Sequence, residues 1–568
     1  MFDVANDRLS YSDLLRPDVG YTLDFAVGMT YSLDLEALLG VPVSLGLLED
    51  ADTEQLRSPL YVLEAIRASA DKIALFCNAG GIKLPDKIQS VYSLLEESVF
   101  QVKLSKNRNF HPKLWALKYS NEIGQAYIKL LVLSRNLTFD SSIDLCISLR
   151  GNVRHARRLK NKPLADMLTY VAPYAKKVKQ QQVLALAEDV LHVASFEVDL
   201  PFEDYEFFPM GIPEHTGEAS HLFEQKYDLF AVSPFLSDDI VHQLTQNSGQ
   251  KILVTRKSSI TKKAMDSFDH VYITKDVLND NEFGAKQDIH AKLYFTTTQD
   301  GNYLYIGSAN ASHNAFYRNV ECLLRLKYKS GYIGIRTFIQ DFIPIENCPY
   351  EELTCVPEIL PADSNQKLID ESLREGVYAL KRATVTLEGE VYAIQVDAKE
   401  LNTTETVMIA PLQRQDLAVP LQPQTTFCGL LLKELSEFFI LRVQGQALVV
   451  KIDTRGIPKE RDRAIYRSII DSKSKFMAYL SFVLAEDHSA IASEMDILDD
   501  TFLCGGTQNG VRAVTAAVYE KMLRVFHQNP NRLKGIADMI HRLDRDVVSQ
   551  EFIQMYKQFE SAAKKVRK

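Results

Sequence analysis

Two pairs of polar residues stand close together in the stretch IHAKLYFTTTQDGNYLYIGSANAS, residues 289 to 312. His290 and Lys292 are two residues apart, and so are Ser308 and Asn310 further along the same stretch. Successive side chains of an extended strand point to opposite faces, so residues two apart share one face. If the two segments are neighbouring strands, a histidine, a lysine, a hydroxyl and an amide converge on one spot.

The same arrangement occurs earlier, in FHPKLWALKYSNEIGQAYIKLLVLSRNLT, residues 110 to 138. His111 and Lys113 form the first pair, and Ser134 and Asn136 form the second. The interval from histidine to asparagine is 25 residues here and 20 in the later copy. One H-x-K pair is typical of an exposed strand, but two copies, each followed by S-x-N, favour a functional site.

Alternating strands and helices are expected to position both copies. Between residues 58 and 135, SPLYVLEAIRASAD and KIQSVYSLLEES have helical spacing, whereas KIALFC and FQVKL are typical of strands. The pattern returns after residue 225, with DLFAVSPF, QKILVTR and HVYITK as strands and DDIVHQLTQN as a helix. This alternation predicts an α/β fold in which one unit is repeated. We expect a first half at 1–162, a helical connector at 163–222 and a second half at 223–349.

The character of the sequence changes after residue 350. ATVTLEGEVYAIQVDAK and FFILRVQGQALVVKID alternate apolar and polar residues between turn signals, as antiparallel strands do. We therefore predict a β-rich accessory domain at 350–457. Helical spacing of apolar residues dominates from Pro458 onward, which predicts a helical C-terminal domain at 458–568.

The two halves, from about residue 20 to residue 330, resemble the phospholipase D superfamily, whose two H-x-K motifs meet across a pseudo-twofold axis. The resemblance implies two pseudo-symmetric α-β-α sandwich halves that share one active site. It also implies a metal-independent phosphodiesterase, without a cofactor, in which one histidine attacks phosphorus to give a phosphohistidine and the other protonates the leaving oxygen. The catalytic residues that it implies are His111, Lys113, Asn136, His290, Lys292 and Asn310.

The sequence departs from the common pattern of this superfamily at one position. Many members carry an aspartate five residues after the lysine, where this chain has Lys118 and Thr297. In this respect it looks like the tyrosyl-DNA phosphodiesterase branch and like bacterial nucleases with the SRNLT form. The sequence alone does not decide which histidine is the nucleophile, because the two halves are pseudo-symmetric. By analogy with that branch, His111 is expected to be the nucleophile and His290 the acid.

Four further residues are predicted to support the site, namely Ser134, Ser308, Asp144 and Glu321. The two acids stand where family members place a carboxylate that orients a catalytic histidine. A buried acid that accepts a ring N–H fixes the histidine tautomer and stabilises the imidazolium. For Asp144, a surface acid at the start of a strand is an equally good interpretation.

Local basic residues indicate the class of substrate, because a net charge of -9 argues against a surface uniformly built for polyanions. RGNVRHARRLKNK, residues 150 to 162, has six lysines or arginines and no acid. Such a run is often only a solvated face, but beside a phosphodiesterase motif it favours nucleic acid. The predicted nucleic-acid-binding residues are Lys103, Lys106, Arg108, Lys118, Arg135, Arg154, Arg157 and Arg158.

The leading hypothesis is a nuclease that cleaves DNA, or else RNA, in bacterial anti-phage defence or DNA processing. The alternatives are a lipid or small-molecule phosphodiesterase and a non-catalytic module that binds nucleic acid or a defence partner. The chain has no phosphate-binding G-x-x-x-x-G-K loop, so a separate helicase is a conceivable partner.

No signal segment opens the sequence, and the apolar run at 37–48 is too short to span a bilayer. We therefore expect a cytoplasmic protein without a membrane partner. The seven scattered cysteines predict reduced thiols rather than a zinc site. The sequence leaves the oligomeric state open, because both motifs lie in one chain.

Overall fold

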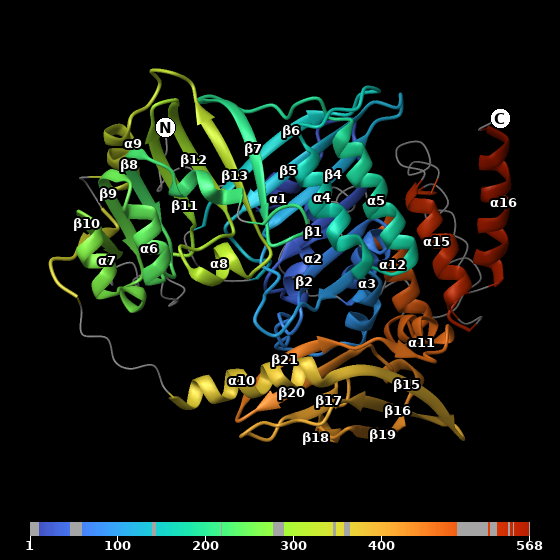
Figure 1. The fold of residues 1–568 in the computed structure, drawn as a ribbon. Coiled ribbons are helices and arrows are strands. Elements are labelled where there is room, and N and C mark those ends of the chain that lie inside the picture. Colours follow the sequence, from blue (N-terminus) through green and yellow to red (C-terminus); the bar gives the residue numbers. More distant parts are fainter. Residues whose placement is uncertain are drawn as a thin grey trace.

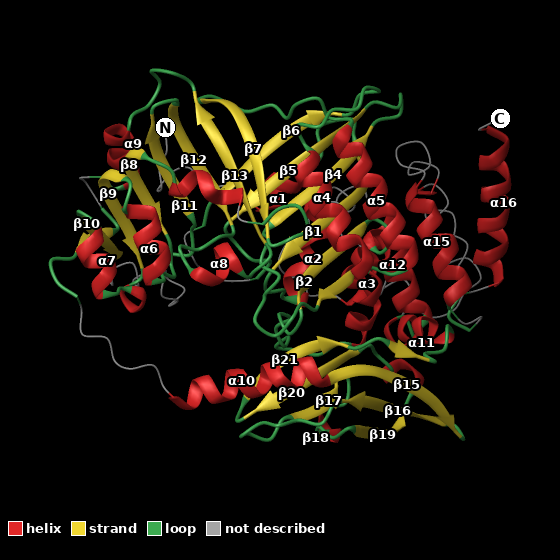
Figure 2. Ribbon diagram, in the orientation of Figure 1, coloured by secondary structure: helices red, strands yellow, loops and turns green. Residues whose placement is uncertain are grey.

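The computed structural model describes residues 11–45, 59–138, 144–216, 218–275, 289–344, 348–356, 364–484, 521–522, 531–543, 546–548 and 550–566. Over these residues the chain is a mixed α/β protein with several sheets (Figures 1 and 2). None of the helices described is both long and apolar enough to cross a bilayer.

The first sheet has six strands in the order β3-β2-β1-β4-β5-β6. Their bounds are β1 Thr22–Thr30, β2 Ile73–Asn78, β3 Val99–Val102, β4 Leu114–Ser120, β5 Ala126–Leu133 and β6 Cys146–Asn152. Strands β1 to β3 are parallel, and β4 to β6 continue the sheet in antiparallel sense. The helices α2, Leu35–Ser44, and α3, Pro59–Ser69, pack in the core on one face, and α4, Lys162–Val171, and α5, Lys177–Leu191, pack in the core on the other.

The second sheet has eight strands in the order β14-β10-β9-β8-β11-β12-β13-β7. Their bounds are β7 Phe202–Met210, β8 Lys226–Val232, β9 Ser248–Thr255, β10 His270–Thr274, β11 Leu293–Thr298, β12 Gly301–Gly307, β13 Glu321–Tyr328 and β14 Tyr350–Glu352. From β10 to β13 the order and sense of the strands repeat those of the first sheet. Its helices are α6, Asp238–Thr245, α7, Lys262–Ser267, α8, His313–Tyr317, and α9, Ile335–Phe342.

The elements at the edges of the second sheet differ from the predicted division of the chain. The segment predicted as a helical connector, 163–222, also contains β7, which pairs with β13. The first residues of the predicted β-rich domain form β14, which pairs with β10. Strand β7 has the sequence FEDYEFFPM, whose acidic first half lacks the clear apolar alternation of a strand.

Two four-stranded sheets follow, in the orders β19-β16-β15-β22 and β18-β17-β20-β21. Their bounds are β15 Leu380–Glu388, β16 Val391–Ala398, β17 Met408–Pro411, β18 Val419–Pro420, β19 Gln424–Leu430, β20 Phe438–Val443, β21 Gln446–Lys451 and β22 Thr454–Arg455. Helix α10, Ser364–Ala379, packs in their core. In Figure 1 this β-rich region and α10 lie below the two large sheets.

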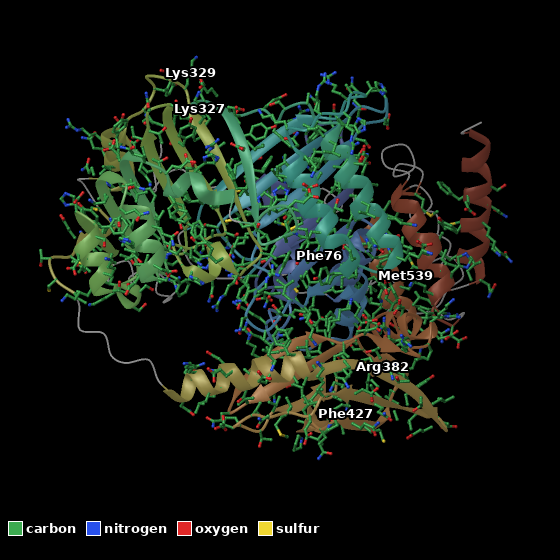
Figure 3. The ribbon with its side chains drawn as sticks, viewed as in Figure 1. Phe76, Lys327, Lys329, Arg382, Phe427 and Met539 are labelled. Atoms are coloured by element: carbon green, nitrogen blue, oxygen red, sulfur yellow. The ribbon has the colours of Figure 1, made fainter. Side chains whose placement is uncertain are left out.

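The other α-helices in the described part of the chain are α1, Tyr11–Leu15, α11, Glu460–Ile469, α12, Lys473–Leu484, α15, Asn531–Arg542, and α16, Gln550–Val566. The last four share one core with α2 and α3, so they lie beside the first sheet (Figure 1). Figure 3 shows Phe76 on β2 and Phe427 in the β-rich region, both of which are buried. Lys327 and Lys329 lie at the end of β13 that is remote from Glu321 (Figure 3).

Candidate active site

The two large sheets are joined beside both His111 and Glu321. The backbone N–H of His111 donates to the carbonyl of Val320 at 2.9 Å, and the N–H of Val320 donates to the carbonyl of Asn109 at 2.9 Å. His111 lies just before β4 of the first sheet, and Glu321 is the first residue of β13 of the second. This short bridge therefore brings a histidine of one sheet next to an acid of the other.

Glu321 contacts the imidazole of His111 directly. Its Oε2 lies 2.8 Å from Nδ1 of His111, and its side chain is fully buried. The hydroxyl of Ser308 donates to the same carboxylate, and Nδ2 of Asn319 donates to Oε1 at 3.1 Å. The carboxylate is thus held by three partners, and the ring of His111 presents its other nitrogen, Nε2, to the site.

Asp144 makes the reciprocal contact. It lies two residues before β6 of the first sheet, and its Oδ1 is 3.2 Å from Nδ1 of His290, which precedes β11 in the second sheet. The hydroxyl of Ser134 donates to the same oxygen at 2.8 Å. The Asp144 side chain is only 9% exposed, which excludes the interpretation as a surface acid. Each histidine is therefore oriented by a carboxylate from the opposite sheet.

The two serines have matching hydrogen bonds. The hydroxyl of Ser134 accepts from the N–H of Leu145 at 2.8 Å, and that of Ser308 accepts from the N–H of Cys322 at 3.0 Å. In both cases the serine N–H donates back to the carbonyl of the same neighbour. Each serine therefore binds the residue that directly follows an acid of the site, Leu145 after Asp144 and Cys322 after Glu321.

The two lysines are buried beneath the histidines. Nζ of Lys113 lies 3.0 Å from Nε2 of His111, and Nζ of Lys292 donates to the carbonyl of His290. Their relative exposures are 1% and 0%, so two amino groups are buried side by side with the histidines. An anion bound at this point would favour the protonated form of both, because little solvent screens the charges.

The two asparagines complete the motifs. Oδ1 of Asn136 accepts a hydrogen bond of 3.4 Å from the backbone N–H of Ser32. This contact uses the amide oxygen and none of the N–H groups of the side chain. Asn310 is 8% exposed, and its Oδ1 is buried without a hydrogen-bond partner among the described residues. This unpaired atom is an acceptor, so a group with an N–H or O–H would satisfy it, whereas only the Nδ2 of Asn310 can donate to an anion.

The environment changes the acid–base behaviour of all four basic groups. Burial lowers the pKa of His111 to about 4, although Glu321 opposes this change. Burial likewise lowers the pKa of His290, with Asp144 in opposition. Burial lowers the pKa of Lys113 to about 8, and burial together with Lys113 lowers that of Lys292. At neutral pH His111 is thus a neutral imidazole whose Nε2 carries an electron pair rather than a proton. The neighbour of this nitrogen is Nζ of Lys113, at 3.0 Å.

Two hydroxyl residues that the sequence analysis did not single out hold the S-x-N segments. The hydroxyl of Thr30, at the end of β1, accepts from the N–H of Leu137 at 3.1 Å. The hydroxyl of Ser233, after β8, accepts from the N–H of Ala311 at 2.8 Å. Both donors, Leu137 and Ala311, follow the asparagine of their motif by one residue. Only the sheet register shows that Thr30 and Ser233 are equivalent, so no local sequence signal identifies them.

Arg256 is a further cation that the sequence analysis missed. It follows β9, and its Nε donates to the carbonyl of Ile289 at 2.9 Å, directly before His290. It also lies close enough to Lys292 to contribute to the lowering of the pKa of that lysine. Arg256 therefore adds positive charge on the His290 side of the site.

The three predicted basic residues before His111 bind other parts of the chain and thereby hold the loop that leads to His111. Their partners are the carbonyl of Leu380 for Lys103, at 2.8 Å, the carboxylate of Glu375 for Lys106, at 2.6 Å, and the carbonyl of Arg318 for Arg108, at 2.7 Å. Arg135, within the first S-x-N motif, donates to the carbonyl of Thr138 at 3.0 Å. These four residues thus lie near the motifs, and each makes a contact within the chain.

The structure does not bring the other basic residues to the histidines. Lys118 forms an ion pair of 2.7 Å with Asp189 towards the far end of β4. Arg154, Arg157 and Arg158 are exposed and follow β6, which begins beside Asp144 and runs seven residues away from it. A strand of that length spans roughly 20 Å. The basic run at 150–162 therefore lies at the opposite end of the first sheet from the site.

Comparisons with known proteins were made for both sequence and structure. No protein-family model matches the sequence, and no curated protein matches it significantly.

The structure is similar to yeast tyrosyl-DNA phosphodiesterase, with a TM-score of 0.36 and 11% identity over 57% of this chain and 87% of that chain. It is also similar to phosphatidylserine synthase of Haemophilus influenzae, with a TM-score of 0.34 and 10% identity over 64% of this chain and 88% of that chain. For NucT from Helicobacter pylori the TM-score is 0.20, with 17% identity over 24% of this chain and 94% of that chain. These structural neighbours are all members of the phospholipase D superfamily, which the paired H-x-K and S-x-N motifs of this chain resemble.

Proposed function

We propose that this protein is a phosphodiesterase whose two motifs form one active site of the phospholipase D type, and that its substrate is nucleic acid. The observation that carries the proposal is the reciprocal pair of contacts, His111 with Glu321 and His290 with Asp144. A module that only binds an anion needs cations, but it does not need two histidines whose tautomers are both fixed by buried carboxylates.

The first step is attack by Nε2 of His111 on phosphorus. Glu321 accepts the Nδ1–H of the neutral ring, which leaves the Nε2 electron pair for the new P–N bond. The P–O bond to the leaving group breaks, and the leaving oxygen takes a proton from the imidazolium of His290. Asp144 stabilises the protonated form of His290 before this transfer.

The second step returns the enzyme to its starting state. His290, now neutral, takes a proton from water while the water oxygen attacks phosphorus, and the P–N bond to His111 breaks. In both steps Lys113, Lys292 and the amide of Asn310 donate hydrogen bonds to the non-bridging oxygens. Lys113 gives up its contact with Nε2 of His111 when a phosphate oxygen becomes its partner.

We propose DNA as the substrate, with RNA as the alternative. A nucleic-acid substrate is supported by the SRNLT sequence and by the missing aspartates, in which this chain resembles nuclease members of the superfamily. Arg256 near Lys292 adds a cation on a side where a polymer would have further phosphates. On the same resemblance we propose bacterial anti-phage defence or DNA processing as the setting, with a helicase as a conceivable partner.

The test is cleavage of labelled single- and double-stranded DNA and RNA in excess EDTA. We expect the wild-type chain to cleave at least one polymer, and we expect His111→Ala and His290→Ala to abolish cleavage. His270→Ala is the matched control, because His270 also contacts a carboxylate, that of Glu352, but at an exposed edge of the second sheet. Cleavage that needs a metal, or that survives both substitutions, would show the proposal to be wrong.

A further inference from the structure

Helix α10 is anchored beside the loop that leads into His111. Nζ of Lys106 lies 2.6 and 2.8 Å from the two carboxylate oxygens of Glu375, and the hydroxyl of Tyr378 donates to the carbonyl of Ser105 at 3.3 Å. These contacts join the C-terminal half of α10 to the first sheet, although α10 belongs to the β-rich region in sequence (Figure 1). The helix is therefore fixed next to the site rather than loosely attached.

Tyr31 links His111 to this helix. Its ring centroid lies 5.0 Å from that of His111, at an interplanar angle of 57°, and Nζ of Lys113 lies 6.0 Å from the same ring. Burial raises the pKa of the Tyr31 hydroxyl; of the charges on α10, Arg374 opposes this change and Asp370 adds to it. Val377 of α10 packs against Gly80, and the next residue, Gly81, packs against the carbonyl of Tyr31, so the turn of α10 that carries Arg374 lies near Tyr31.

Arg374 is on the face of α10 that the fold leaves exposed. The buried face of the helix carries Ile369, Leu373 and Val377. Asp370, Arg374 and Tyr378 are four residues apart and share another face. Asp370, on the same face, accepts a hydrogen bond of 2.8 Å from Gln366. Within the described part of the chain, no carboxylate lies within ion-pair distance of Arg374. Its guanidinium is thus an exposed cation on the helix that is anchored beside the His111 loop.

The two halves of the site differ at the position of Tyr31. In sheet register the residue of the second sheet that is equivalent to Tyr31 is Pro234. An aromatic ring therefore lines the His111 side at a position where the His290 side has none. Nζ of Lys103 lies 5.8 Å from the ring centroid of Tyr378 on α10 and donates to the carbonyl of Leu380.

We propose that Arg374 binds the phosphate next to the scissile one on a nucleic-acid strand, with the ring of Tyr31 between the two phosphate positions. This inference rests on the proposed function, and it names a subsite that selects a polymer over a small diester. A guanidinium binds a phosphate through paired charge-assisted hydrogen bonds, so the subsite contributes binding without any base preference. A small diester that fills only the histidine site does not reach Arg374.

The experiment compares the full-length chain with Arg374→Ala and Arg374→Lys. The matched control is Arg336→Ala, since Arg336 is also an exposed helical arginine but stands on α9, which packs against the second sheet away from α10 (Figure 1). Binding of fluorescent single-stranded DNA and RNA oligonucleotides is measured in a His111→Ala background over a range of salt concentrations. Cleavage of the same oligonucleotides and of bis(p-nitrophenyl) phosphate is measured in the active background.

We expect Arg374→Ala to weaken oligonucleotide binding roughly tenfold and to lower the slope of log K against log salt by about 0.7. The KM for cleavage of the oligonucleotide should rise, whereas hydrolysis of bis(p-nitrophenyl) phosphate should not change. Arg374→Lys should retain most of the salt slope, and Arg336→Ala should behave as wild type.

Three outcomes would overturn the Arg374 subsite. These are unchanged oligonucleotide binding in Arg374→Ala, an equal loss in Arg336→Ala, and an equal loss of activity on the small diester. If the wild-type chain cleaves neither substrate, the proposed function fails, and the binding measurements then decide the subsite by themselves.

Discussion

Glu321, at the start of a strand of the second sheet, holds the imidazole of His111 from the first sheet, with 2.8 Å between Oε2 and Nδ1. Asp144 of the first sheet makes the same kind of contact with His290 of the second. Because the carboxylates are exchanged, neither sheet alone contains a histidine together with the acid that orients it. The active site that we propose therefore depends on the junction of the two sheets as well as on the two motifs.

Because each histidine depends on a carboxylate of the other sheet, we expect Glu321→Gln and Asp144→Asn each to lower kcat by on the order of a hundred-fold, with little change in KM. An amide of the same shape no longer stabilises an imidazolium and allows the wrong tautomer of the ring. Steady-state kinetics on an oligonucleotide measure the effect. Glu352→Gln is the matched control, because Glu352 contacts His270 at an exposed position. Unchanged kcat in both site variants would contradict the role of the carboxylates.

The pKa values of the two histidines predict an acidic optimum. In the mechanism that we propose, His111 attacks only as the neutral ring, so activity should rise with pH through its pKa of about 4. His290 donates only when it is protonated, and burial places its pKa below the ordinary 6.5, so activity should fall as pH rises through that value. The profile of kcat/KM, which reports the free enzyme, should therefore be bell-shaped, with its maximum between about pH 4 and 6.5. A maximum above pH 7 would contradict the assignment.

The same shifts make the folded state less stable in acid. Both histidines have folded pKa values below 6.5, so between the folded and unfolded values the unfolded chain binds more protons than the folded one. Stability consequently rises with pH in this window, is fully present above about pH 6.5, and is lost as pH falls towards 4. Thermal unfolding recorded at each pH separates this loss from the acidic limb of the activity profile.

The sequence predicted the features of the fold that depend on local pattern. The strands around both H-x-K motifs, and the position of each S-x-N motif at the end of the next strand, follow from alternation and from turn residues. The exchange of Glu321 and Asp144 was not predictable, because it depends on how two sheets distant in sequence meet. The same is true of Thr30 and Tyr31, whose roles depend on sheet register and on a helix more than three hundred residues later. Strand β7 was assigned to the helical connector because its acids mask the periodicity of an edge strand.

Gly28 on β1 is expected to tolerate no side chain. A Cβ at this position would lie 2.5 Å from Cδ1 of Leu75 and 2.8 Å from Cη2 of Trp115, and both neighbours are buried. Gly28→Ala should therefore destabilise the protein by about 1–3 kcal/mol, because the overpacked core must shift. Gly40→Ala is the matched control: Gly40 lies within helix α2, and a Cβ there meets nothing within 4 Å. Alanine is the better helix former, so this variant should be neutral or more stable. Equal urea midpoints for the two variants would contradict the prediction.

Buried charges join the first sheet to the C-terminal helices. Nη1 of Arg461 on α11 lies 2.6 Å from Oε2 of Glu96, and the two side chains are 7% and 1% exposed. The hydroxyl of Ser436 and the N–H of Glu437, both from the β-rich region, donate to the other carboxylate oxygen at 2.7 and 2.8 Å. Glu96 is thus the point at which three parts of the chain meet.

Removal of one partner of this pair should cost far more than removal of both. Arg461→Met leaves the Glu96 carboxylate buried without its cation, and we expect a loss of about 3–5 kcal/mol in the free energy of unfolding. Glu96→Gln combined with Arg461→Met removes both charges of this pair and leaves the neighbouring Glu437–Lys451 pair in place, so the double variant should recover a large part of that loss. Urea denaturation of the two single variants and the double variant gives the coupling free energy. Lys475→Met, which removes an exposed ion pair with Asp471, should change the urea midpoint far less. Additive effects of the two substitutions would show that the Glu96–Arg461 contact does not hold the regions together.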